Sequence, residues 1–304
     1  MWHLFLLAVF LMNLSAMHGI LRRADIVSML GNKKVFLLHD THNGEDSIPN
    51  QFEIFCKALN ENKGKHKFHI MVEQPEQNFI QSQINPTVLT HIAHALQLHN
   101  FKNISLQNIE ISSKSHGAHF LFLNNFKVPS HNYKYVAGNS YCILDELTFQ
   151  DIIDEFLHWH IDLTNFVSTI TCEQQKELCQ EQLNQTFDCF QDLINCLNRL
   201  KINTEQPICK LDLKSKFKNF NPYTFIPYIL RTFTPLLNLN LLQLLENDLH
   251  ENIIVIAGAM HLDKVRFLLL QDSNNKWLGS IKNNEETSIL NEEDFQKIFS
   301  FCLI

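Results

Sequence analysis

The fold is indicated most clearly by residues 253–261, which read IIVIAGAMH. The first half of this stretch is an apolar run of strand length, and the run stops at small residues followed by His261. Residues 35–42, VFLLHDTH, repeat this form near the other end of the chain, and residues 68–73, FHIMVE, place Glu73 after a third apolar run. Near-continuous apolar runs are typical of strands buried in a parallel sheet. The sequence therefore predicts an α/β fold.

The polar residues that follow these runs predict one shared site. Ligands bind open α/β sheets just outside the carboxyl ends of the strands, so His42, Glu73 and His261 are expected to converge there. Imidazole and carboxylate groups are ligands of divalent metals and also groups for acid–base work. We expect these three residues to hold a metal or, without metal, to share proton transfer, with Asp40 and Glu73 as the catalytic carboxylates. Asp40 is a candidate ligand, a candidate general base, or a partner that fixes the tautomer of His42.

Three further residues are accessory candidates for this site. His39 directly follows the first apolar run, Glu110 lies near the end of a strand predicted over 105–111, and Asp263 follows His261 at the start of a predicted helix. The amino terminus of such a helix favours an anionic ligand or a developing oxyanion. Motifs of other hydrolase and nucleotide-binding classes are absent from the sequence: G-x-S-x-G, H-E-x-x-H, a P-loop and a dinucleotide fingerprint.

Composition limits the class of partner. The chain has 304 residues, 45% of them hydrophobic and 19% charged, which is globular, and its net charge is −7 without a basic run. Nucleic-acid binding requires a clustered cationic face and is therefore disfavoured. Oligomeric state is not indicated by the sequence.

The N-terminus predicts export. Residues 2–12 form an apolar segment of the length of a signal-peptide core, and Ala16 is a plausible last residue before cleavage. We therefore expect a signal peptide over 1–16 and a periplasmic, extracellular or membrane-peripheral protein. A buried N-terminal helix is the alternative. No other segment is long and apolar enough to span a membrane.

Cysteine usage agrees with export. Four of the eight cysteines are regularly spaced at Cys172, Cys179, Cys189 and Cys196. That spacing suits a helical hairpin closed by disulfides Cys172–Cys196 and Cys179–Cys189, which an oxidising compartment would allow. Buried thiols and a metal site remain alternatives, and sequence does not choose among the connectivities.

The predicted organisation is a mostly parallel central sheet flanked by helices, with a large helical insertion, or cap, that carries the cysteine cluster. The core halves are placed at 17–146 and 251–304, and the insertion at 147–250. Strands are predicted over 34–38, 66–72, 105–111 and 252–257, with an edge strand over 276–281. Helices are predicted over 20–30, 85–99, 151–162, 173–200, 225–249 with breaks at Pro227 and Pro235, 261–271 and 292–301.

The three motifs together resemble the TraB/Tiki superfamily, which includes erythromycin-esterase and ChaN-like relatives. Proteins of this group place a G-x-x-H or G-E-x-H segment after the first strand, an acidic residue after the second and a G-x-x-H segment after a late strand. Residues 258–261 match the late segment, and Glu73 matches the acidic position. Residues 39–42 match only in part, since His39 replaces the glycine and Asp40 replaces the glutamate of some branches.

The resemblance implies a metal-dependent hydrolase in the Tiki branch, His/Glu acid–base hydrolysis in the esterase branch and haem binding in the ChaN-like branch. Two hypotheses follow. In the first, the chain is an exported hydrolase that cleaves a peptide or a small-molecule ester with a divalent metal or a His/carboxylate pair. Alternatively it is a catalytically degenerate exported binding or host-interaction protein on the same fold.

Overall fold

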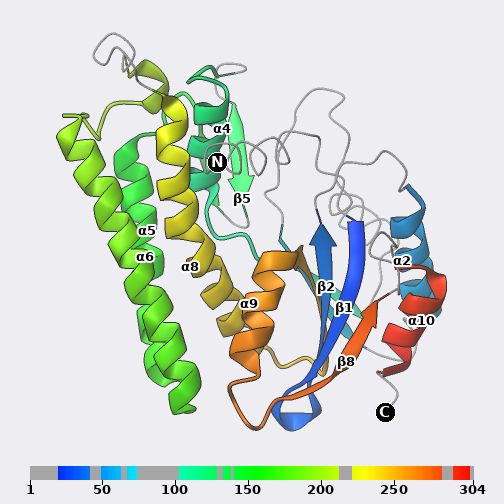
Figure 1. Cartoon of the computed structure of the whole chain (residues 1–304). Coiled ribbons are helices and arrows are strands. Elements are labelled where there is room, and N and C mark those ends of the chain that lie inside the picture. The colour runs from blue at the N-terminus through cyan, green and yellow to red at the C-terminus, as the bar shows by residue number, and fades with distance from the viewer. Residues whose placement is uncertain are drawn as a thin grey trace, which may run out of the picture. The chain divides into compact units, whose positions relative to one another are not determined.

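The structure is a computed structural model of the chain, and it describes residues 20–41, 49–62, 67–73, 103–128, 133–137, 140–211, 221–282 and 290–301 (Figure 1). The predicted leader over 1–16, His42 and the predicted helix over 85–99 lie outside these residues. The described residues divide into two compact units. One comprises the described residues up to 73 together with 103–108 and those from 247 onward, and the other comprises Ile109–Glu246.

The first unit is built on a six-stranded sheet with the order β4-β3-β7-β2-β1-β8. Parallel ladders join β3 to β4, β3 to β7 and β2 to β7. Antiparallel ladders add β1 and then the edge strand β8. The predicted α/β class with a mostly parallel sheet is confirmed. The strands are β1 (Ile20–Ser28), β2 (Lys34–Thr41), β3 (Phe68–Val72), β4 (Ile104–Asn108), β7 (Asn252–Gly258) and β8 (Lys276–Lys282).

The helix predicted over 20–30 is wrong, because this segment is strand β1. Its apolar residues recur at helix-like intervals, but the strand pairs on both sides, with β2 and with β8. Ala24 and Ile26 lie in the hydrophobic core. Asp25 points to the opposite face and is fully buried among polar partners. Pairing with β2 and β8 therefore overrides the helix-like local pattern. The burial of Asp25 is tolerated because neighbouring elements supply polar partners.

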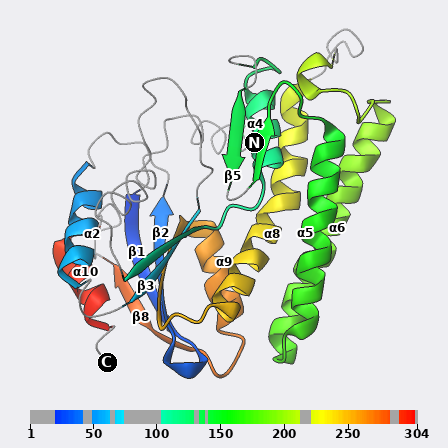
Figure 2. The ribbon, with the colours of Figure 1, turned by 180° about the vertical axis from the view of Figure 1, so that it is seen from behind.

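Helices cover both faces of this sheet. Helices α2 (Pro49–Asn62) and α10 (Glu292–Ser300) pack together on one face, and α9 (Ala259–Leu269) lies on the other (Figures 1 and 2). The main hydrophobic core lies under α2 and α10, where Phe55 meets Phe295 edge-on with ring centroids 5.4 Å apart. Asn291 begins α10 with a capping box that includes Asp294. A short 3-10 turn, η1 (Leu30–Asn32), links β1 to β2.

The second unit is mainly helical. It contains α4 (Ser113–Leu123), the hairpin strands β5 (Lys134–Ala137) and β6 (Ser140–Ile143), α5 (Phe149–Thr169), α6 (Glu173–Arg199) and α8 (Ile226–Asn247), with 3-10 turns η2 (Ile208–Lys210) and η3 (Pro222–Phe225). It begins at Ile109, so it also takes in α4 and the hairpin, which precede the insertion predicted over 147–250. Among the described residues, no helix combines the length and apolar character needed to cross a membrane.

The predicted breaks in the last helix of this unit are wrong. Pro227 lies in the first turn of α8, where proline is tolerated, and Pro235 lies inside a continuous helix. An internal proline costs about 3 kcal/mol because it removes one backbone hydrogen bond and crowds the preceding turn. The helix buries a long apolar face that includes Phe233, Leu236 and Leu241. Burying each such side chain contributes roughly 1.5–3 kcal/mol, which offsets the cost of the proline.

The predicted disulfides are also wrong. The segment that was expected to fold back as a hairpin is one continuous helix, α6, with Cys172 at its N-cap and the other three cysteines along it. At about 1.5 Å of rise per residue, Cys179 and Cys189 are about 15 Å apart, whereas a disulfide needs Cα atoms within about 7 Å. All four cysteines are free thiols, and Cys179 and Cys196 are buried. Of the three alternatives that the sequence left open, the one with buried thiols describes Cys179 and Cys196.

Candidate functional site

Glu73 and His261 meet at the carboxyl ends of two parallel strands. Glu73 directly follows β3, and its backbone N–H donates to the carbonyl oxygen of Ile256 at 2.9 Å, which extends the ladder to β7 by one residue. β7 ends at Gly258, and α9 begins at the next residue, so His261 lies in the first turn of that helix. The convergence expected for these two residues is therefore present in the structure.

The contacts around Glu73 hold its carboxylate in a fixed position. The backbone N–H of Gly258 donates to Oε2 of Glu73 at 2.8 Å. The other oxygen, Oε1, lies 3.5 Å from Nε2 of His261. Gly258 is the N-cap of α9 and has no side chain to cap the helix, so the Glu73 carboxylate meets a backbone donor at the positive end of the helix dipole. Each side chain is 16% exposed, so the pair is largely desolvated and still reached by water.

The donor pair fits two positions of a metal site. A tetrahedral ion with bonds of about 2.0–2.2 Å has ligand atoms about 3.3–3.6 Å apart, and the separation of Glu73 Oε1 from His261 Nε2 is 3.5 Å. Carboxylate and imidazole are both zinc ligands. The third expected ligand, His42, lies outside the described residues. Within the described part of the chain, Glu73 and His261 are thus two candidate metal donors.

Asp40 lies at the same end of the sheet. It is the partner of Gly258 in the parallel ladder between β2 and β7, and its side chain is 3% exposed. Successive residues of a strand point to opposite faces, so Asp40 shares the face of Leu38, and His39 points to the other face. The two neighbouring candidates therefore occupy different environments.

His39 and Asp263 belong to a charge cluster on the α9 face. The centre of this cluster is Asp25 of β1, whose Oδ2 lies 2.9 Å from Nε2 of His39 and 2.8 Å from a guanidinium nitrogen of each of Arg23 and Arg266. Arg23 also pairs with Asp263, which is on the same helix as Arg266. The structure thus places both accessory candidates in contacts that join β1, β2 and α9.

The cluster around Asp25 is already neutralised by cations of the chain. Burial favours the neutral form of Asp25, but hydrogen bonds from His39 and Ser280 and the nearby positive charges of His39 and Arg23 outweigh it and lower its pKa to about 2. Asp25, His39 and Asp263 have donor atoms close enough to hold a metal. Two guanidinium groups occupy the cation position there, so the arrangement is that of a buried ion-pair network that stabilises the fold.

Glu110 lies in the second unit, where it forms its own pair. It is buried, and its Oε2 lies 3.0 Å from Nε2 of His116. Its other oxygen accepts the backbone N–H of Ile111 at 3.0 Å. Burial would raise the pKa of Glu110, but the charge and hydrogen bond of His116 and the backbone donors hold it below its ordinary value. These contacts account for the burial of the carboxylate.

A second buried carboxylate, Glu155, was not found from the sequence. It lies on α5 and accepts a hydrogen bond from the Ser112 hydroxyl and a backbone N–H from Ser115, at the start of α4. Burial raises its pKa to about 7 against these hydrogen bonds and the charge of Lys114. Its position in an amphipathic helix gives no sign of this role, since a helical Glu is usually solvated.

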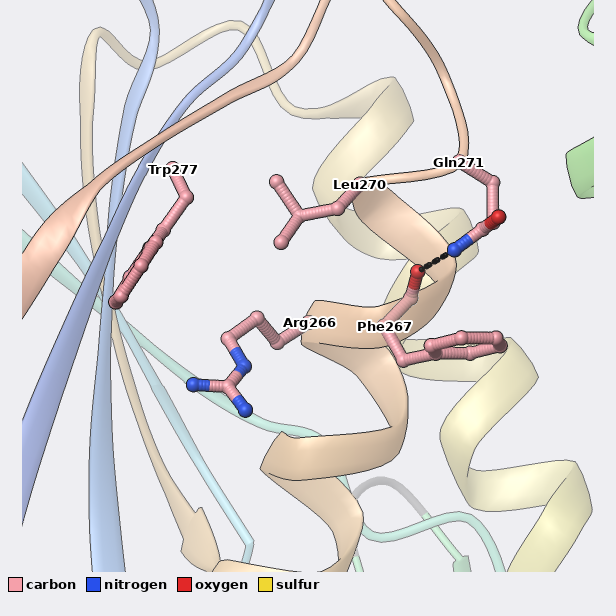
Figure 3. Close-up of a pocket in the computed structure, with 5 residues that line it drawn as sticks. All are labelled: Arg266, Phe267, Leu270, Gln271 and Trp277. Carbon is pink, nitrogen blue, oxygen red and sulfur yellow. Dashed lines mark hydrogen bonds between the residues drawn. The ribbon is translucent and has the colours of Figure 1, made fainter.

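A pocket of about 350 Å³ lies beside the last turns of α9, away from the first turn that carries His261. Figure 3 shows Trp277 of β8 facing Leu270 and Arg266 across it, with Gln271 donating to the carbonyl oxygen of Phe267. Arg266 is engaged with Asp25 and Asp263, so the pocket offers mainly apolar surface. It is not associated with the strand-end residues.

Comparison with known proteins adds no relative: no family model, no curated protein and no solved structure matches the chain. The function is therefore inferred from the residues themselves. The pair Glu73–His261 is the part of the site predicted from the sequence that the structure brings into contact.

Proposed function

We propose that the chain is a hydrolase that cleaves an amide or ester bond, with Glu73 and His261 as its reacting groups. The observation that carries this proposal is their contact at the carboxyl ends of β3 and β7, next to the amino terminus of α9. Open α/β sheets bind their ligands at this edge. A carboxylate beside an imidazole is a common pair for general acid–base catalysis.

The chemistry assigned to each residue follows from its contacts. The Glu73 carboxylate is fixed through Oε2 by Gly258, which leaves Oε1 to accept a proton from an attacking water. The water oxygen bonds to the substrate carbonyl carbon, and the proton passes through the His261 imidazole to the leaving nitrogen or oxygen as the old bond breaks. The amino terminus of α9 is the positive end of the helix dipole, which favours the developing oxyanion. Asp40, the ladder partner of Gly258, is a candidate for orienting His42 or for acting as the general base.

A divalent metal is the alternative form of the proposal, in which Glu73 and His261 bind an ion instead of transferring protons. Glu73 and His261 would hold it with His42 as the third ligand, and when bound it would lower the pKa of its water towards neutrality and polarise the substrate carbonyl. The likeness of residues 258–261 and Glu73 to the motifs of the TraB/Tiki superfamily supports this assignment. The predicted leader over 1–16 supports an activity outside the cytoplasm.

Hydrolysis of two probes tests the proposal. Purified protein is assayed with dye-quenched casein for amide bonds and with p-nitrophenyl acetate for ester bonds, after chelation and after reloading with Zn²⁺. Glu73→Gln keeps an oxygen for Gly258 but loses the charge, and we expect it and His261→Ala each to lower the rate by at least about 100-fold. Matched controls are Glu177→Gln and His158→Ala, whose side chains are exposed on α6 and α5.

Two results would reject the hydrolase. Wild-type protein that hydrolyses neither probe with or without metal would leave the degenerate binding protein as the better description. Activity that survives in both site variants at the level of the controls would move the reaction away from Glu73 and His261. Circular dichroism of each variant separates loss of the site from loss of the fold.

A further inference from the structure

A second cluster of metal-binding side chains lies at the opposite, amino-terminal edge of the same sheet. His69 is the second residue of β3, and Asp248 and His250 lie in the segment that enters β7. Their donor atoms all lie within 4.8 Å of one another. Because β3 and β7 are parallel neighbours, the entry to one strand lies beside the start of the other. This cluster has no part in the hydrolase proposed above.

One carboxylate faces two imidazoles in this cluster. Oδ2 of Asp248 contacts Nδ1 of His69, and Oδ1 lies 2.6 Å from Nδ1 of His250. The two rings are 4.8 Å apart between centroids. Burial favours the neutral form of Asp248, but the hydrogen bonds from His250 and His69 keep its pKa below the ordinary value. The three groups are thus already gathered around a small volume that carries one negative charge.

The backbone around the cluster is fixed by contacts of its own. The backbone N–H of His250 donates to Oδ1 of Asp248 at 2.7 Å, which sets the turn between them. The next residue, Glu251, accepts the N–H of Lys34 at 2.7 Å through its carbonyl oxygen. His69 is held on both sides, since it is the ladder partner of Ser105 in β4 and of Ile253 in β7. A site on such supports loses little freedom when an ion binds.

The cluster differs from the one around Asp25 in what balances its charge. Asp25 is bound by two arginines, whereas the ion pairs of Asp248 within the described residues are those with His69 and His250. Neutral imidazole is a metal ligand, and a proton on Nδ1 can be exchanged for a metal ion. The charge of Asp248 is therefore available to a cation in a way that the charge of Asp25 is not.

Ser105 provides an outer contact that suits a metal-bound histidine. Its hydroxyl oxygen lies 3.5 Å from Nε2 of His250, on the other side of the ring from Asp248. Once a metal displaces the Nδ1 proton of His250, donation from Nε2–H to this oxygen would hold the ring in the tautomer that a metal requires. The His250 side chain is 40% exposed, while those of Asp248 and His69 are 5% and 11% exposed, so His250 is the ligand that water reaches most easily.

We propose that His69, Asp248 and His250 form a binding site for one divalent transition-metal ion of the zinc type. Two imidazoles and one carboxylate, with water in the remaining position, are a ligand set that zinc uses in proteins. The bound ion would join the segment entering β7 to β3 and thereby brace the strand that carries Gly258 at its other end. The Nδ1 atom of His250 lies 2.6 Å from Oδ1 of Asp248, closer than two ligand atoms on one ion, so binding would require the half-exposed His250 to rotate away from the carboxylate.

Cobalt binding tests this site separately from the strand-end pair. The protein is prepared without a tag, with Glu73→Gln and His261→Ala already in place, and titrated with Co²⁺ while the visible d–d absorption is recorded. We expect one equivalent to bind, with a spectrum of nitrogen and oxygen ligands, and Zn²⁺ to displace it. Adding Asp248→Asn or His250→Ala should weaken binding by more than the 10–100-fold typical of losing an outer-shell partner. Adding His158→Ala, on an exposed face of α5, should leave it unchanged.

Thermal denaturation with and without Zn²⁺ gives a second readout. Zn²⁺ should raise the Tm of the background protein and leave that of the Asp248→Asn form unchanged, because only an intact site links binding to folding. If His250→Ala does not fold, His250→Gln replaces it, since this variant keeps the size and hydrogen-bonding capacity but removes the imidazole. Equal Co²⁺ affinity in the background and in both variants, or no binding at about 100 µM Co²⁺, would reduce the cluster to a hydrogen-bonded turn and overturn the proposal.

Discussion

Replacing Asp25 with Asn perturbs the charge cluster that joins β1, β2 and α9. Asn has the size of Asp and removes only the negative charge. Asp25 is fully buried, and its pKa is lowered from 3.8 to about 2, so the folded protein favours the charged form. A shift of this size corresponds to about 2 kcal/mol, at about 1.4 kcal/mol for each pKa unit. Arg23 and Arg266 are each 29% exposed, so water partly solvates the charges that the variant leaves without this partner. We expect Asp25→Asn to lower the free energy of unfolding near pH 7 by about 2–3 kcal/mol, somewhat less than the roughly 3–5 kcal/mol for breaking a fully buried ion pair.

The pH dependence of this difference has a defined sign. A carboxyl group whose pKa is lowered by folding stabilises the protein above its unfolded pKa and loses that contribution as the pH falls through its folded pKa. The gap between wild type and Asp25→Asn should therefore be full above about pH 5, fall to roughly half at pH 3 and vanish below pH 2. Asp263→Asn is the matched comparison, because Asp263 is in the same cluster but 47% exposed. We expect it to cost less than about 1 kcal/mol.

Urea unfolding followed by the fluorescence of Trp277 measures both variants in the unit that carries the cluster. Trp2 and Trp159 are replaced by Phe so that Trp277 of β8 is the single tryptophan. A gap that stays constant between pH 7 and pH 3 would show that the charge of Asp25 is not the source of the effect. An Asn variant as stable as wild type would refute the ion-pair network altogether.

Three further predictions concern the second unit. Glu155→Gln should remove a pH dependence of stability, because the pKa of Glu155 is raised to about 7 and wild type therefore loses about 2–3 kcal/mol of stability as the pH rises from 5 to 8. Urea unfolding at the two pH values measures this loss, and an equal loss in wild type and variant would show that the Glu155 carboxyl titrates normally. Gly117→Ala places a Cβ 2.5 Å from Sγ of Cys142 and should lower the Tm at a cost of about 1–3 kcal/mol, and adding Cys142→Ala should restore most of it; no recovery in calorimetry would contradict the packing. A tryptic map under non-reducing conditions should contain neither of the two disulfides predicted from sequence, and finding either would contradict the single helix α6.

The parallel sheet and the residues at the carboxyl ends of its strands could be predicted because both depend on local sequence patterns. Apolar runs predicted the buried parallel strands. The rule that ligands bind at the carboxyl ends of such strands predicted that Glu73 and His261 lie close together. The segment of β1 could not be predicted, because its pattern matches a helix and only its partners β2 and β8 make it a strand. The roles of the polar residues likewise depend on which strands pair with one another. His39 faces Asp25 because β2 alternates, and the sequence near His39 does not contain Asp25.

The hydrolysis rate of a double variant tests most directly whether Glu73 and His261 form one site. Glu73→Gln, His261→Ala and the double variant are compared with wild type on the probe that wild type hydrolyses. Residues that act as a unit are strongly non-additive, so each single change should cost at least about 100-fold and the double change no more than about threefold beyond the worse single variant. Losses that multiply in the double variant, or a double variant as active as wild type, would show that the contact between these two side chains is not the centre of the reaction.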